Sequence, residues 1–249
     1  MSPMPHRQCD DLPTASALGL SQLIHHAEVE STMDEVHRVA ATGAPAGLLV
    51  IADRQTHGRG RAGRVWSSRP GAGVWMTLLE RPADAAASGV LALRLGMSIA
   101  RAVQPFVDGK VRLKWPNDVY VDDGKLAGIL VEARWRDAAL DWVAIGVGLN
   151  IQVPADYQGA RAVRDGVTRR QLLYALVPAM RDASQQRGVL SARELDEWGA
   201  HDLARDRRIV LPKAGIARGI AADGALLVQE DGRDTFTSIR AGSLLFEAE

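Results

Sequence analysis

The segment Gly58–Trp66 constrains the fold more than any other stretch of this sequence. It reads Gly-Arg-Gly-Arg-Ala-Gly-Arg-Val-Trp and follows an apolar run, residues 46–52, that is suited to a buried strand. Its glycines match the spacing of a dinucleotide-binding loop, in which a helix must begin and hold the pyrophosphate. Here Pro70 and Gly71 follow shortly, and they prevent a long helix from starting. We therefore expect a loop whose arginine side chains bind phosphate or carboxylate as bidentate forks.

The rest of the chain alternates strand and helix signals up to about residue 202. Apolar runs predict strands over residues 20–29, 46–52, 74–79, 111–113, 119–121, 128–133 and 140–148, and helical spacing predicts a helix over 89–107. Three capping-box patterns predict further helix starts, at Thr32-x-x-Glu35, Thr168-x-x-Gln171 and Ser191-x-x-Glu194. This pattern is typical of an α+β fold with a mixed sheet and helices.

Beyond residue 203 the sequence changes to short apolar runs separated by turns. Asp223-Gly224 and Asp231-Gly232 are hairpin-turn dipeptides, and no helical pattern lies between them. We therefore expect three parts: an N-terminal tail over 1–20, a larger domain over 21–202 and a small β-barrel over 203–249.

Composition excludes several classes of protein. Thirty basic residues balance thirty acidic ones, so the chain does not coat nucleic acid by bulk charge. A single cysteine, Cys9, excludes a disulfide framework and a cysteine-built metal site. The N-terminus lacks the layout of a signal peptide, and the most apolar stretch, Val90 to Val107, is interrupted by Arg94 and Arg101. We expect a cytoplasmic protein that spans no membrane.

Three shorter motifs follow the glycine–arginine segment. They are Lys114-Trp115-Pro116-Asn117-Asp118, Lys125–Leu130 and Gly146–Asn150. Taken singly, each has a plain structural explanation: turn chemistry for the first, a surface lysine for the second, a crowded strand for the third. The turn Asp122-Asp123-Gly124 predicts a hairpin that places Asp118 and Lys125 near the same end.

In this order and spacing, the four motifs resemble the biotin–protein ligases, and the resemblance covers residues 20 to 245. It implies a catalytic domain related to class II aminoacyl-tRNA synthetases, with an SH3-like barrel at its C-terminus. It also implies an enzyme that uses ATP and Mg²⁺ to form biotinyl-5′-AMP and passes biotin to one lysine of a biotin carboxyl carrier protein. About 30 residues before Ser31 are too few for the DNA-binding domain of some members, so we expect no DNA binding. The resemblance is compatible with a homodimer.

The resemblance also implies roles for individual residues. Lys125, Arg61 and Asp118 would be catalytic, with Lys125 at the reacting carboxylate and α-phosphate and Asp118 near the metal or the incoming amine. Mg²⁺ would be held mainly by phosphates. Biotin would be bound by Ser31, Thr32, Gln55, Arg59, Gly60, Arg61, Lys125, Gly128 and Gly148. ATP would be bound by Arg59, Arg61, Arg64, Trp66, Lys114, Asn117, Lys125 and Asn150.

The sequence departs from the family pattern at three places. Met33 stands where members often have Asn, Ala62 stands where some carry another arginine, and the C-terminus lacks a late arginine, which makes a C-terminal contact to the nucleotide doubtful.

Two other functions are alternatives. A lipoate or octanoate ligase would share the architecture, but the polar Ser31, Thr32 and Gln55 suit a ureido ring better than a dithiolane. A non-catalytic nucleotide-binding protein is the other alternative.

Overall fold

The computed structural model describes residues 12–82, 84–154, 157, 159–232 and 235–247. Its larger part is a mixed seven-stranded sheet in the order β1-β2-β3-β7-β6-β5-β4, in which only the β1–β2 pair is parallel. The strands are β1 (Gln22–Val29), β2 (Leu48–Gln55), β3 (Gly73–Glu80), β4 (Val111–Lys114), β5 (Asp118–Val121), β6 (Gly124–Arg136) and β7 (Ala139–Asn150).

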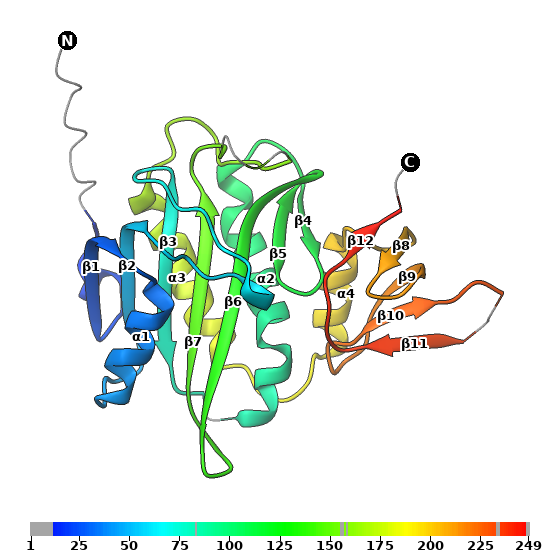
Figure 1. Ribbon diagram of the computed structural model, residues 1–249, viewed down its shortest axis with the longest axis horizontal. Coiled ribbons are helices and arrows are strands. Elements are labelled where there is room, and N and C mark those ends of the chain that lie inside the picture. Colours follow the sequence, from blue (N-terminus) through cyan, green and yellow to red (C-terminus); the bar gives the residue numbers. More distant parts are fainter. Residues whose placement is uncertain (1–11, 83, 155–156, 158, 233–234, 248–249) are drawn as a thin grey trace.

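Helices cover both faces of this sheet (Figure 1). They are α1 (Thr32–Ala41), α2 (Leu91–Val103), α3 (Arg169–Ser184) and α4 (Ala192–His201). Side chains alternate along the strands, so Leu49 and Ile51 of β2 join the main core with α2 and α3, whereas Leu48 and Val50 pack with α1 in a second cluster. The sheet is therefore buried on both faces near its centre.

A second sheet of five antiparallel strands follows α4. Its order is β11-β10-β9-β8-β12, and Figure 1 shows it beside α4 at one edge of the larger part. The strands are β8 (Arg208–Leu211), β9 (Gly215–Ile220), β10 (Leu226–Gln229), β11 (Phe236–Ile239) and β12 (Leu245–Phe246). The arrangement agrees with the predicted fold class, a mixed sheet with helices followed by a small all-β unit.

Several elements end where the sequence signals indicate. The capping boxes at Thr168 and Ser191 are both present, and the predicted hairpins at Asp122, Asp223 and Asp231 join β5–β6, β9–β10 and β10–β11. The predicted helix over 89–107 is regular only from Leu91 to Val103, because short 3₁₀ turns over Ala85–Val90 and Gln104–Phe106 flank it.

Two expectations were wrong. The Thr32-x-x-Glu35 capping box does not form: Ser31 is the N-cap residue, and the Thr32 hydroxyl bonds to Gln55 and Thr77 instead. The predicted tail over 1–20 also includes packed residues. Residues 1–11 lie outside the described part, but Leu18 and Leu20 are buried in the main core.

Candidate active site

A cavity of about 400 Å³ opens on the sheet between α1, the glycine–arginine loop and the strands β4 to β7. Every site residue predicted from the sequence lines it. The sheet order sets its shape: β2 and β6 are three strands apart, which is about 14 Å at the usual strand spacing. The cavity therefore suits an elongated molecule. The predicted residues are Ser31, Thr32, Gln55, Arg59, Gly60, Arg61, Arg64, Trp66, Lys114, Asn117, Asp118, Lys125, Gly128, Gly148 and Asn150.

The part of the cavity nearest α1 carries buried hydrogen-bonding groups. Gln55 Oε1 accepts from the backbone nitrogen of Thr32 at 2.9 Å and from its hydroxyl at 3.0 Å. That hydroxyl also lies 2.8 Å from Thr77 Oγ1. Ser31 is 1% exposed, and among the described residues its hydroxyl has no hydrogen-bond partner. A buried hydroxyl left unpaired is costly, so this atom is well suited to bond a ligand.

The glycine–arginine loop is a compact turn, not an extended flap. Its backbone closes on itself, with Trp66 N donating to Gly58 O at 2.8 Å and Gly60 N donating to Arg64 O at 2.8 Å. At Gly58 a Cβ atom would lie 2.4 Å from the Trp66 carbonyl oxygen, so only glycine fits there. Ser68 ties the far end of the loop to Gln55 with two hydrogen bonds to its backbone. The loop is thus joined to the same residue that orders the polar end of the cavity.

Trp66 lies inside the cavity. Cβ atoms at Gly128 and Gly148 would come within 2.8 and 2.4 Å of its ring, so both glycines provide the flat surface on which the indole packs. Lys125 Nζ lies 5.1 Å from the ring centroid, within cation–π range. The prediction that these two glycines contact biotin is untested, but their contact with Trp66 is direct.

Lys125 is held from several sides. Its ammonium lies 2.8 Å from Asp118 Oδ1, and both side chains are about one-fifth exposed. Its backbone nitrogen donates to Gly159 O at 2.8 Å, and its carbonyl accepts from Arg161 N at 2.8 Å. Asn150 Nδ2 donates to the carbonyls of Lys125 at 3.4 Å and Arg161 at 3.0 Å. In this structure Asn150 supports the lysine; contact with ATP remains a prediction.

Basic side chains gather around Asp118. Burial lowers the pKa of the Lys114 ammonium, Asp118 opposes that shift, and Lys125 and Arg64 add repulsion in the lowering direction. Burial likewise lowers the pKa of the Arg61 guanidinium; Asp118 opposes this shift and Arg64 adds to it. Such crowding of positive charge around one carboxylate is unfavourable by itself and favours binding of a polyanion.

The arginines of the loop have different partners. Arg61 donates to Asn117 Oδ1 at 3.1 Å, and Asn117 donates to Ile129 O at 2.7 Å, which places the guanidinium against β5 and β6. Arg64 donates to Ser243 Oγ at 2.9 Å. Arg59 differs, because its guanidinium bonds to two carboxylates, those of Asp34 and Glu132.

Sequence reasoning missed the contribution of the C-terminal segment. Ser243 and Leu244 line the cavity, although the sequence gave reason to doubt a C-terminal contact. Phe246 on β12 lies 5.1 Å from Lys114 Nζ, as measured from its ring centroid, and 3.9 Å from the Arg207 guanidinium carbon. Ser243, Leu244 and Phe246 lie in a loop and in the two-residue strand β12, which are too short to show a periodic pattern, so no sequence signal marks them. Met33, Thr77, Trp115 and Tyr120 also line the cavity.

Comparisons with known proteins identify the fold. Residues 27–150 match the profile of the Biotin/lipoate A/B protein ligase family. The structure of a biotin protein ligase from Aquifex aeolicus superposes with a TM-score of 0.73 over 92% of this chain and 100% of that chain, at 23% identity. One from Leishmania major, solved with biotinyl-5-AMP, gives 0.62 over 89% and 99%, at 25% identity. The fold is that of the biotin/lipoate protein ligases.

Sequence relatives narrow the class further. A biotin–[acetyl-CoA-carboxylase] ligase from Mycobacterium tuberculosis is 33% identical over 95% of this chain and 94% of that protein. The chain belongs to the biotin–protein ligase family. The bifunctional ligase/repressor BirA of Bacillus subtilis is 38% identical over 54% of this chain, and that of Escherichia coli is 33% identical over 75%. This chain spans 42% and 63% of the length of those two proteins.

Proposed function

We propose that this chain activates biotin with ATP to biotinyl-5′-AMP and transfers biotin to a lysine of a biotin carboxyl carrier protein. The name of the M. tuberculosis relative and the biotinyl-5-AMP bound to the L. major enzyme support this assignment. The observation that carries it is the buried, unpaired Ser31 hydroxyl beside the Thr32–Gln55 pair, in the same cavity as the cations around Asp118. This arrangement supports a ligand that joins a polar ring to a polyanion.

In the first step, an oxygen of the biotin carboxylate attacks the α-phosphorus of ATP, and the bond to pyrophosphate breaks. Negative charge increases on the phosphate oxygens in the transition state. We assign Lys125 to that charge, because its ammonium is fixed by Asp118 and by the backbone contacts on both sides. Arg61, Arg64 and Lys114 bind the phosphates in the ground state.

In the second step, the acceptor amine attacks the acyl carbon, the C–N bond forms and AMP leaves with the C–O bond electrons. The amine must lose a proton. Of the described residues that line the cavity, Asp118 alone carries a carboxylate. We assign it to orient the incoming amine and to accept that proton.

Asp118 and the phosphates of ATP are a donor set that suits Mg²⁺. Among the described residues, no three His, Cys, Asp or Glu side chains lie together as a metal cage. Mg²⁺ commonly binds through one or two carboxylates, several waters and substrate phosphates, and Asp118 can supply the carboxylate. When bound, the ion would neutralise phosphate charge.

A lipoate or octanoate ligase is the second candidate, because the family profile includes it. The buried Ser31 hydroxyl favours a ureido ring, since a ligand that cannot bond it leaves it unpaired, and the polar Thr32–Gln55 pair lies beside it. The test is pyrophosphate release with ATP, Mg²⁺ and either biotin or lipoate. Release with biotin alone supports the proposal; release with lipoate alone, or with neither, contradicts it.

Location and assembly remain predictions. By length and composition the stretch Ala85–Phe106 could cross a membrane, but 67% of its apolar window is buried inside the protein, where it serves as a core segment. We propose a cytoplasmic enzyme that binds no specific DNA, which a gel-shift assay with competitor DNA tests. Gel filtration tests whether it forms a homodimer.

A further inference from the structure

The first arginine of the glycine–arginine loop is fixed to two carboxylates on different elements. One terminal nitrogen of Arg59 donates to Asp34 Oδ1 at 2.6 Å, and the other donates to Glu132 Oε1 at 2.5 Å. Asp34 lies in the first turn of α1 and Glu132 lies on β6. The guanidinium therefore bridges the helix that begins at the polar end of the cavity and the strand that carries Lys125.

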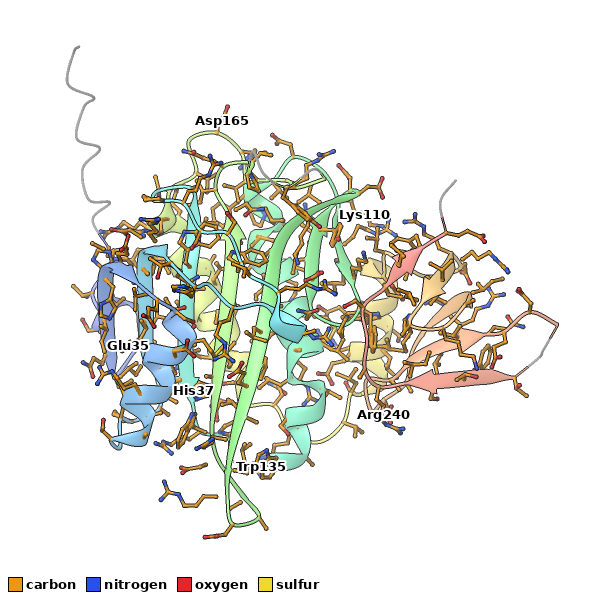
Figure 2. The ribbon with its side chains drawn as sticks, in the orientation of Figure 1. Glu35, His37, Lys110, Trp135, Asp165 and Arg240 are labelled. Atoms are coloured by element: carbon orange, nitrogen blue, oxygen red, sulfur yellow. The ribbon has the colours of Figure 1, made fainter. Side chains whose placement is uncertain are left out.

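Glu132 is itself held in place by a second chain of contacts. Trp142 Nε1 donates to His37 Nδ1 at 3.1 Å, which leaves the ring proton on Nε2. That nitrogen lies 3.0 Å from Glu132 Oε2, so the two carboxylate oxygens serve different partners. Figure 2 shows His37 on α1. Arg59 thus meets an acceptor whose orientation is already set by buried and half-buried groups.

Anchoring Arg59 also fixes the loop behind it. Arg59 pairs with Val65 across the loop in an antiparallel bridge, next to the backbone bond from Trp66 N to Gly58 O. Arg61 and Arg64 lie in the segment of the loop between Arg59 and Val65. A shift of Arg59 would therefore displace Arg61 and Arg64, which belong to the group of basic side chains around Asp118.

We propose that the side chain of Arg59 makes it a positioning residue: its guanidinium fixes the loop through Asp34 and Glu132 and is not itself a ligand of biotin or phosphate. The inference rests on the proposed function. It differs from the sequence expectation, in which Arg59 grips phosphate together with Arg61 and Arg64. Two carboxylates already offset the positive charge of this guanidinium, so it attracts an anion less strongly than a guanidinium without such partners would.

The competing interpretation makes the carboxylates a resting place from which Arg59 swings onto the phosphates. The two interpretations predict opposite effects of Glu132→Gln. If Arg59 positions the loop, loss of the Glu132 charge loosens the loop and raises the KM for ATP. If Arg59 is a phosphate ligand, the same change frees it and lowers that KM.

The experiment compares Arg59→Ala, Glu132→Gln, Asp34→Asn and the Arg59→Ala/Glu132→Gln double variant. Glu197→Gln is the matched control, because it removes an ion pair with Arg101 between α2 and α4. Two quantities are measured: the KM for ATP and kcat from pyrophosphate release, and the rate of trypsin cleavage after Arg61 and Arg64 in the ligand-free protein. Thermal melts confirm that each variant is folded.

We expect Glu132→Gln to raise both the cleavage rate and the KM for ATP about twofold to fivefold, as the loss of a partly exposed ion pair allows. The double variant should match Arg59→Ala, because the two residues act through one contact. Unchanged cleavage in Glu132→Gln, or a lower KM, overturns the proposal. If the wild type releases no pyrophosphate with biotin, the proposed function fails, while the cleavage measurements still decide the role of Arg59.

Discussion

The Lys125 ammonium lies 2.8 Å from the Asp118 carboxylate of the neighbouring strand. The two residues are not cross-strand partners, since Asp118 pairs with Gly128 and Lys125 pairs with Tyr120. The pairing register of β5 and β6 shifts between Val119 and Tyr120, and such an irregularity redirects side chains locally. The ion pair therefore depends on this shift, and it holds the ammonium at one position in the cavity.

Replacing Lys125 by alanine tests its catalytic role. A fixed cation at developing charge stabilises the transition state more than the ground state, and loss of one such donor typically lowers kcat about 10²–10³-fold. We expect that fall in pyrophosphate release at saturating ATP, with an unchanged circular dichroism spectrum. Lys110→Ala is the control, because Lys110 is exposed and lies outside the cavity (Figure 2). If Lys125→Ala keeps the wild-type kcat, Lys125 does not stabilise the transition state, and we would assign that role to Arg61.

Arg64→Ala should act mainly on ATP binding. Arg64 lines the cavity and donates to Ser243, so its guanidinium is positioned for a phosphate before the reaction begins. We expect the KM for ATP to rise more than kcat falls, as for loss of ground-state binding. Ser243→Ala should raise the same KM by a smaller factor. A fall in kcat without a change in KM would show that Arg64 acts in the transition state.

Gln55→Leu should weaken biotin and leave ATP unaffected. Gln55 Oε1 accepts two hydrogen bonds from Thr32, and their loss leaves buried polar groups unpaired beside the ligand. A cost of about 1–3 kcal/mol corresponds to a rise in the KM for biotin of roughly fivefold to 150-fold. Gln22→Leu, on the exposed face of β1, is the matched control. If both changes raise the KM for biotin equally, Gln55 is not part of the biotin site.

The pH dependence of the KM for ATP should show the protonation state of Lys114. Burial, with repulsion from Lys125, Arg207 and Arg64, holds the pKa of Lys114 below its ordinary value of 10.5, although Asp118 opposes the shift. The KM for ATP should therefore rise at a lower pH than titration of an exposed lysine would give. Between the two pKa values the unfolded chain binds more protons, so this group makes stability increase with pH. Lys114→Arg should move the KM rise to higher pH; an unchanged profile would contradict the assignment.

The sequence predicts where helices, strands and turns lie along the chain better than it predicts the contacts of individual side chains. Local signals suffice where a single turn decides the structure, as at Thr168, Ser191 and Asp223. Thr32 shows the limit: the N-cap residue is Ser31, and the Thr32 hydroxyl donates to Gln55, 23 residues away. A tertiary hydrogen bond replaced a local one.

The same reason explains what was missed in the site. All predicted site residues line one cavity because α1, the glycine–arginine loop and the strands β2 and β4 to β7 meet at one place. Ser243 and Phe246 approach that cavity only because the second sheet packs beside α4, a relationship that no periodicity contains. Arg59 likewise has carboxylate partners 25 and 73 residues away.

The central claim is that this chain transfers biotin to a carrier lysine, and intact-mass spectrometry tests it most directly. A purified biotin carboxyl carrier domain is incubated with ATP, Mg²⁺ and biotin, with and without this protein. The account predicts that the mass increases by one biotinyl group only when this protein is present, and that the increase is lost when the acceptor lysine is changed to arginine. An unchanged mass with active, folded protein would contradict it.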